Sequence, residues 1–243
     1  MMTDPHIILE IATADLETTR QAIAGGADRI ELCANLGEGG TTPAYGTMRI
    51  CRERFSVPIF PIIRPRAGDF LYTDDEFRTM QLEVELARSM GFEGVVIGLL
   101  LSDGQIDLHR TARLRELAYP MECTFHRAFD RCLDPNQALE DLINIGVNRI
   151  LTSGQHLTAP EGVSCIAQLQ QQANERIIIM PGSGVRPENI QALRAKTGCI
   201  EFHTSLRVWK ESQMQFRHPN FSGAQESYLN PDINEAEVRK MKE

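Results

Sequence analysis

Eight short apolar segments alternate with helix-like segments along the chain, and this alternation limits the fold more than any other feature. The apolar segments lie at residues 7–11, 29–33, 57–63, 94–98, 122–126, 149–152, 177–180 and 200–203. Strands that alternate with helices form a parallel sheet, and eight such units in 243 residues predict an α/β fold, a closed (β/α)8 TIM barrel. An open doubly wound sheet is the alternative. The first strand–helix turn lacks the G-x-G-x-x-G pattern of a dinucleotide site.

Capping residues and glycines set the expected helix ends. A capping box at 73–76 and the pair Asp134-Pro135 mark helix starts, and glycines follow several helices. These signals predict helices at about residues 13–25, 43–55, 73–91, 107–118, 134–146, 159–173 and 187–198.

The chain changes character after Arg207. Residues 213–229 are polar, poor in aliphatic side chains and without a period, which predicts a long loop. The segment 232–235 resembles an N-cap, so a short helix is expected towards residue 243. We therefore expect one TIM-barrel domain over 1–243, with an irregular tail of loop and short helix over 207–243.

Titratable side chains recur at alternate positions of several strands. Glu31, His126 and His203 lie near strand ends, where TIM barrels keep their active sites, and Glu10 lies inside the first strand. A charge facing the helix layer would be buried away from water at a cost of several kcal/mol, so these side chains are expected inside the barrel. Glu10, Glu31 and His126 are the acid–base candidates. The alternatives are ion pairs of the two glutamates with Arg29, Arg64 or Arg127, and a core histidine at 126.

The stretch Arg64–Phe70 follows a buried strand and predicts an anion site at the barrel mouth, because each arginine carries a permanent charge and five donors. A structural ion pair with Asp69 is the alternative. The glycine-rich loop 181–185 after the seventh strand also suits an anion, through free backbone N–H groups, although a plain turn explains it too. The candidate anion-binding residues are Arg64, Arg66, Ser153, Gly154, Gly182, Gly184, His203 and Ser205.

Composition excludes several function classes. A net charge of −8 argues against nucleic acid as a partner, and the longest apolar run, 95–101, is too short for a membrane span. No signal peptide is visible, so a cytoplasmic location is expected. None of the four lysines lies at the end of a predicted strand, which argues against a Schiff-base aldolase. The sequence contains neither the H-x-H nor the H-E-x-x-H motif of metal-dependent hydrolases.

Several of these segments together resemble the CutC family, named for copper homeostasis. The matching stretches are 25–33, 38–43, 63–70, 124–130, 149–154, 180–185 and 201–205. The resemblance implies a cytoplasmic barrel, a homo-oligomer (dimer or tetramer) and a link to copper, with Cys33 as the candidate Cu(I) ligand. Cu(I) prefers several soft sulfur ligands, and only Met180 could join Cys33. The alternative role for Cys33 is a small side chain filling the barrel end.

Two functions therefore stand side by side, and whether the chain is an enzyme stays open. One is a copper homeostasis protein that binds Cu(I). The other is an enzyme acting on a small anionic metabolite, with phosphorylated compounds among the candidates, through its strand-end Arg, Glu and His side chains. A third possibility is a non-catalytic binding or scaffold protein, which would bind neither the metal nor the anion.

Overall fold

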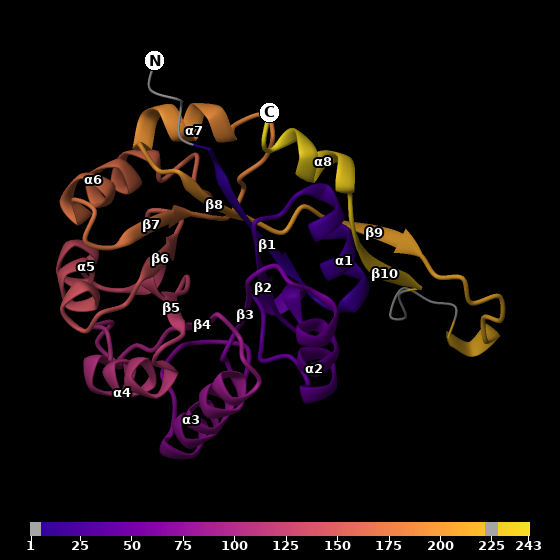
Figure 1. Cartoon of the computed structure of the whole chain (residues 1–243), viewed down its shortest axis with the longest axis horizontal. Coiled ribbons are helices and arrows are strands. Elements are labelled where there is room, and N and C mark those ends of the chain that lie inside the picture. The colour runs from indigo at the N-terminus through magenta and orange to yellow at the C-terminus, as the bar shows by residue number, and fades with distance from the viewer. Residues whose placement is uncertain (1–5, 222–227) are drawn as a thin grey trace.

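The computed structural model describes residues 6–221 and 228–243 and places the strands in a ring (Figure 1). The strands are β1 Ile8–Thr13, β2 Arg29–Leu32, β3 Ile59–Pro61, β4 Gly94–Ile97, β5 Glu122–Phe125, β6 Arg149–Thr152, β7 Ile178–Pro181 and β8 Glu201–Thr204. They pair in parallel as β3-β2-β1-β8 and β4-β5-β6-β7. The two sheets meet where Ile63 N–H donates to Val96 O at 2.8 Å and where β7 lies beside β8. The predicted (β/α)8 barrel is confirmed.

Helices surround this ring on its outside (Figure 1). They are α1 Leu16–Gly25, α2 Tyr45–Arg54, α3 Asp74–Ser89, α4 Leu108–Ala118, α5 Pro135–Asn144, α6 Val163–Ala173, α7 Ile190–Thr197 and α8 Glu235–Lys240. The short 3₁₀ helices are η1 Leu36–Glu38, η2 Phe129–Arg131 and η3 Pro219–Phe221. Within the described ranges, no helix combines the length and apolar character needed to cross a membrane.

The observed helix starts follow local hydrogen bonding. The capping box at Thr73 and Glu76 forms as predicted, and Asp134 caps α5. Helix α7 begins at Ile190, later than expected, because Asn189 closes the preceding loop: its Oδ1 accepts from Arg186 N–H and its Nδ2 donates to Gly184 O, both at 2.9 Å. Asn189 therefore holds residues 184–189 as a loop beside the cavity at the barrel mouth, and the helix begins only after it.

Apolar side chains fill two separate regions. The larger lies between strands and helices and includes Leu9, Ile11, Cys123 and Phe125. A small cluster lies inside the barrel and consists of Cys33, Phe60, Ile62 and Val96, with Leu36 against it. Charged side chains fill much of the remaining interior, as the alternation along the strands predicted. Side chains at even positions of β1 and odd positions of β2 face inward.

The tail differs from the sequence-based expectation in one respect. Strands β9 Arg207–Glu211 and β10 Leu229–Ile233 pair antiparallel and form an arm that projects from the barrel (Figure 1). Four of the five β9 residues are exposed, so no buried face imposes the alternation that reveals a strand. Residues 222–227 of the expected loop lie outside the described residues. The terminal helix is present as α8, and its Val238 packs where Gly25 leaves room on α1.

Candidate functional site

A cavity of about 470 Å³ opens at the carboxyl ends of the barrel strands. Its wall is built from strand ends and from the loops that follow them, which is where TIM barrels place their active sites. The lining residues are Ala12, Glu31, Leu36, Glu38, Gly39, Ile62, Arg64, Gly68, Phe70, His126, Arg127, Arg131, Leu151, Ser183, Gly184, Arg186, His203, Thr204 and Ser205. Glu31, Arg64 and His126, which the sequence predicted to converge, all line it.

His203 connects two carboxylates at the inner end of this cavity. Its Nδ1 lies 2.8 Å from Glu10 Oε1, and its Nε2 lies 3.7 Å from Glu31 Oε2. Strand register explains the meeting, because β1 pairs with β8 so that Glu10 stands beside His203. Glu31 comes from β2, on the other side of β1. The sequence had grouped His203 with the anion-binding residues, whereas the structure places it between the two glutamates.

Arginines lie deeper in the barrel and hold the charge of Glu10. Arg29 Nε donates to Glu10 Oε2 at 2.5 Å, and its Nη2 donates to Glu201 Oε2 at 2.7 Å. Arg149 Nε also donates to Glu201, at 2.6 Å. Glu10 is fully buried and lies outside the cavity lining. It therefore acts through His203.

The surroundings push the two glutamates apart in acidity. Burial alone would raise the pKa of Glu10, but the charge of Arg29 and the hydrogen bond from His203 outweigh it and hold that pKa below its ordinary range. Burial raises the pKa of Glu31 to about 7, against the lowering effect of His203. Burial would lower the pKa of His203, but Glu10 and Glu31 raise it on balance. Such separation is typical of acid–base sites.

Four arginines line the outer part of the cavity, and two of them keep an unneutralised charge. Arg64 donates only to backbone carbonyls, those of Glu38, Gly40 and Gly68, at 2.7–3.0 Å. Arg186 donates to Val185 O at 3.2 Å and to Thr204 Oγ1 at 3.1 Å. In the described part of the chain, neither pairs with a carboxylate. Arg64 is buried, where a cation without a counter-charge is unfavourable, and Arg186 is half-buried beside the cavity. Both positions therefore favour an anionic ligand.

The other two rim arginines are tied to Asp130. Arg127 Nε donates to Asp130 Oδ2 at 2.8 Å, and Arg131 Nη1 lies 3.9 Å from the same oxygen. Burial and the neighbouring Arg127 lower the pKa of Arg131. The sequence had not selected Arg127, Arg131 or Arg186 as anion-binding residues. Their place directly after β5 and β7 was the available signal.

Several predicted anion-binding residues lie outside the cavity. Arg66 pairs with Glu76 at 2.6 Å and with Asp69 at 3.0 Å, so it matches the structural ion pair that was the alternative. The Ser153 hydroxyl donates a hydrogen bond to Asp130 and accepts one from Arg127 Nη2. A Cβ at Gly154 would lie 2.4 Å from the Gly162 carbonyl oxygen, and a Cβ at Gly182 would lie 2.4 Å from the Leu151 side chain, so both glycines fill tight places outside the cavity lining. Gly184 and Ser205 do line the cavity.

His126 lies at the end of β5 with an unusual hydrogen-bond pattern. Its Nδ1 accepts the backbone N–H of Ala128 at 3.1 Å. Its Nε2 is buried without a hydrogen-bond partner in the described structure. Burial, together with the charge of Arg64, lowers the pKa of His126 to about 3. The imidazole is therefore neutral at pH 7.

Cys33 does not provide a site that fits Cu(I). The thiol is buried beside Glu31, and burial together with that carboxylate raises its pKa well above the ordinary value. The sulfur of Met180, the other soft side chain, instead accepts a hydrogen bond from Arg29 Nη2 at 3.2 Å. Among residues 6–221 and 228–243, no three His, Cys, Asp or Glu side chains gather as a metal-binding set. A protonated lone thiol lacks the soft ligands that Cu(I) prefers.

Sequence comparison finds one protein family and several of its members among the proteins similar to this chain. The profile of the CutC family matches residues 7–208. A family protein CutC of Chromobacterium violaceum is 49% identical over 240 residues, covering 97% of both chains. A human protein named copper homeostasis protein cutC homolog is 41% identical over 236 residues, covering 97% of this chain and 86% of the human one.

Comparison with solved structures finds a member of the same family. The crystal structure of CutC from Streptococcus agalactiae superposes with a TM-score of 0.79 and 32% identity, covering 82% of this chain and 98% of that chain. N-(5′-phosphoribosyl)anthranilate isomerase from Pyrococcus furiosus gives a TM-score of 0.57 at 11% identity, covering 97% of this chain and 96% of that one. The second likeness shows the shared fold alone.

Proposed function

This chain belongs to the CutC family, whose members are named for copper homeostasis, and we propose that its cavity binds a small anionic metabolite and moves a proton on it. The relay Glu10–His203–Glu31 at the inner end of the cavity is the observation that carries this proposal. One carboxylate of the relay is fixed as an anion, and the other changes its protonation near neutral pH. Such a pair suits a general acid and base.

The relay assigns a role to each of its members. Glu10, held by Arg29, accepts the hydrogen bond from His203 Nδ1 and fixes the ring orientation. The His203 Nε2 then faces Glu31, so a proton can be held on either group. Glu31 lines the cavity and is the residue that meets the ligand. Glu10 is accordingly a positioning residue rather than a catalytic one.

Arg64 and Arg186 supply the affinity for an anion. Their guanidinium groups hydrogen-bond only neutral oxygens, so a phosphate or carboxylate would complete their partners. Ser183, Gly184 and Ser205 stand nearby, after β7 and β8. Barrels of this type often bind phosphate with these two loops.

A thermal-shift screen with phosphorylated and carboxylic metabolites tests the proposal. At a ligand concentration of about 100 times Kd, binding adds about 2.7 kcal/mol, which raises the Tm of a domain of this size by about 5–10 °C. The shift should disappear in Arg186→Met and persist in Arg113→Met, a variant of an exposed arginine on α4. A screen without any shift, or a shift unchanged in Arg186→Met, contradicts the proposal.

A direct Cu(I) site at Cys33 is the weaker reading of the family's name. It is favoured only by the position of the thiol beside Glu31, and the donor set described above does not fit the metal. We therefore propose no Cu(I) site at Cys33.

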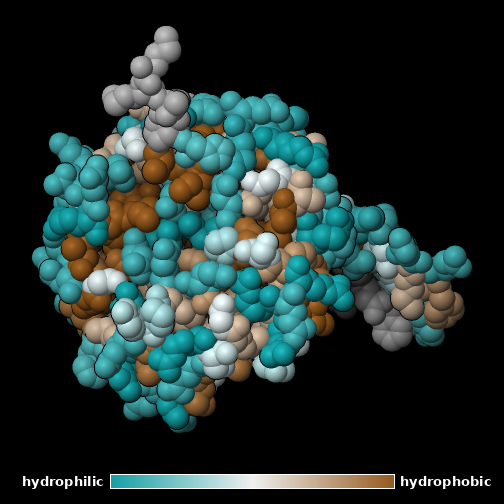
Figure 2. All heavy atoms as spheres, in the orientation of Figure 1, coloured by the Kyte–Doolittle hydropathy of each residue, from teal (hydrophilic) through white to brown (hydrophobic). Residues whose placement is uncertain are grey.

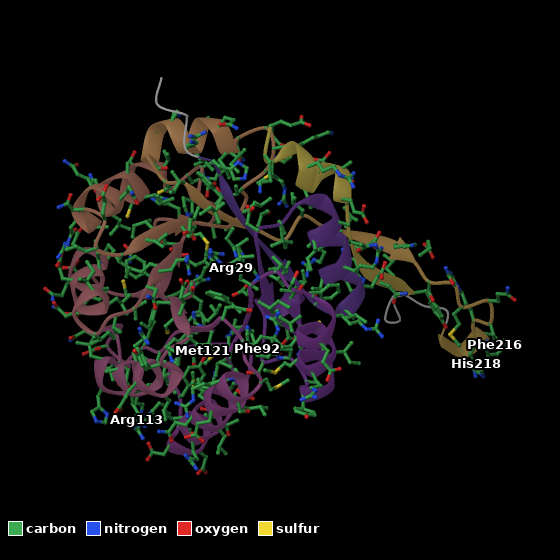
Figure 3. All side chains as sticks on the ribbon, viewed as in Figure 1. Arg29, Phe92, Arg113, Met121, Phe216 and His218 are labelled. Atoms are coloured by element: carbon green, nitrogen blue, oxygen red, sulfur yellow. The ribbon has the colours of Figure 1, made fainter. Side chains whose placement is uncertain are left out.

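The location and the assembly of the chain complete the proposal. We propose a cytoplasmic protein, in keeping with six cysteines that are all free thiols in the structure. We also propose a homo-oligomer held by the β9–β10 arm. Trp209 and Phe216 on that arm are 57% and 66% exposed. Figure 2 shows moderately hydrophobic, tan atoms among hydrophilic ones at the far end of the arm. Figure 3 shows Phe216 and His218 at its far end. Exposed apolar surface of this kind marks contact sites.

A further inference from the structure

Two buried polar atoms of the cavity lining lack a hydrogen-bond partner in the described structure, Arg64 Nε and His126 Nε2. The second belongs to a side chain that the acid–base relay does not use. The His126 Nε2 has no partner in the described structure, although the residue is only 4% exposed. A buried polar atom without a partner is unfavourable, and such atoms in native proteins need an explanation. A ligand in the cavity that His126 lines would supply the missing partner.

The proton of this imidazole is held on the unpartnered atom. Because Nδ1 accepts the Ala128 N–H, a neutral ring carries its hydrogen on Nε2. The neighbouring charge of Arg64 and the surrounding burial both disfavour the cation. His126 is thus a hydrogen-bond donor without charge at pH 7, and it is a poor base.

The ring is also fixed in place. The Phe70 ring lies 5.0 Å from it and the Phe125 ring lies 6.1 Å from it, centroid to centroid. A Cβ at Gly98 would stand 2.3 Å from ring atoms of His126, so only glycine at this position leaves room for the imidazole. A rigid donor that needs no reorganisation is what stabilises developing charge.

His126 and the relay come from distant sides of the barrel. In the ring of strands, β5 lies three places from β2 and three places from β8. Glu31 of β2 and His203 of β8 therefore reach the cavity from one part of the wall, and His126 reaches it from another. A small ligand between them meets a base on one side and a neutral donor on the other.

Resting on the proposed function, we infer that the cavity takes an anion that also carries a carbonyl group, and that it removes a proton from the carbon next to that carbonyl. The C–H bond breaks and its proton passes to the Glu31 carboxylate. The electron pair forms the C=C bond of the enolate, and the carbonyl oxygen becomes an oxyanion. His126 Nε2–H donates a hydrogen bond to this oxyanion, and the proton returns from Glu31 to carbon in the reverse step. No oxidant or reductant is needed.

Exchange of carbon-bound hydrogen with solvent tests this inference. The protein is incubated in D2O with pyruvate, as a 2-oxo carboxylate, and in a second arm with dihydroxyacetone phosphate, as a keto phosphate. Deuterium incorporation is followed by NMR against a protein-free blank. We expect catalysed exchange in one arm, and the arm that responds tells carboxylate from phosphate.

Two substitutions separate the roles of the residues. His126→Phe keeps a ring but removes the donor, so kcat for exchange should fall by about 100-fold or more while KM changes little. His126→Gln retains a neutral N–H donor and should recover part of the loss. Glu31→Gln should abolish exchange while the anion still binds.

Other results would overturn the inference. Exchange in neither arm, with Arg186-dependent binding of an anion intact, contradicts the enolisation step but leaves the anion site standing. Exchange unchanged in His126→Phe contradicts the role of the imidazole. A ¹⁵N NMR spectrum at pH 7 tests the same role without any turnover. A cationic His126 ring, or a proton on its Nδ1, would contradict the role of the imidazole as a neutral donor. Loss of all anion binding would remove the proposed function itself.

Discussion

His203 and Glu10 share a hydrogen bond of 2.8 Å inside the barrel, between Nδ1 and a carboxylate oxygen that no solvent reaches. The carboxylate is held by Arg29, and the opposite nitrogen of the ring faces Glu31 in the cavity. One imidazole thus joins a fixed charge to a carboxyl group that titrates near pH 7.

Removing Arg29 should strongly destabilise the fold. Figure 3 places Arg29 within the barrel, where it neutralises both Glu10 and Glu201. Arg29→Ala leaves buried Glu10 with His203 and buried Glu201 with Arg149 as remaining partners, and removes the charge that both shared. We therefore expect a loss of about 3 kcal/mol or more in the free energy of unfolding, measured in urea. Arg113→Ala is the control, because Arg113 lies at the outside of the molecule in Figure 3 and pairs with Glu116 at the surface. It should cost less than about 1 kcal/mol. Equal losses would contradict this account.

Replacing Glu31 should change how stability depends on pH. Burial, Glu10, His203, Cys33 and Arg29 all act on this carboxyl, and together they raise its pKa from 4.5 to about 7. Between these values the folded state binds a proton that the unfolded state does not. This contribution is complete below about pH 4.5 and is lost as the pH rises through 7, at about 1.4 kcal/mol per pH unit. Glu31→Gln should therefore gain about 2.5 kcal/mol relative to the wild type between pH 5 and 8. A constant difference would contradict the raised pKa.

Cu(I) should find no site that depends on Cys33. The thiol is buried and its pKa is raised, and among the described residues Met180, the other soft side chain, is hydrogen-bonded to Arg29 instead. In an anaerobic titration against a chromogenic Cu(I) chelator, we expect the wild type and Cys33→Ala to take up the same amount of metal. Uptake of one equivalent by the wild type that Cys33→Ala loses would restore the direct copper site.

The β9–β10 arm should hold copies of the chain together. Phe216→Ser replaces an apolar side chain that is exposed near the end of the arm. In sedimentation velocity, the wild type should migrate as a dimer or tetramer, and Phe216→Ser should shift towards the monomer at equal concentration. Leu82→Ser, on the exposed face of α3, is the matched control and should leave the assembly unchanged. A monomeric wild type would end this proposal.

The sequence predicted the barrel and the inward position of its charges, because both follow from local periodicity. Glu10, Glu31 and His203 were placed inside by strand alternation and by the cost of burying charge against the helices. The pairing of Glu10 with His203 depends on the register of β1 against β8, which brings together residues 193 positions apart. No local pattern carries that information.

The loops were harder to predict, since side chains there follow no period. Arg186 reaches the cavity because Asn189 shapes its loop, and Arg66 turns away because Glu76 captures it. The sequence treated Arg66 as an anion-binding residue and did not select Arg186. The tautomer of His126 depends on one amide, that of Ala128, which only the folded backbone places beside Nδ1.

Retention of metabolites tests the central claim most directly. Wild type and Arg186→Met are each equilibrated with a defined mixture of anionic, neutral and cationic metabolites, then washed, denatured and analysed by mass spectrometry. The account predicts that the wild type retains one or a few small anions in stoichiometric amount and that Arg186→Met loses them. Retention of no anion, or of the same anions by both proteins, would contradict it.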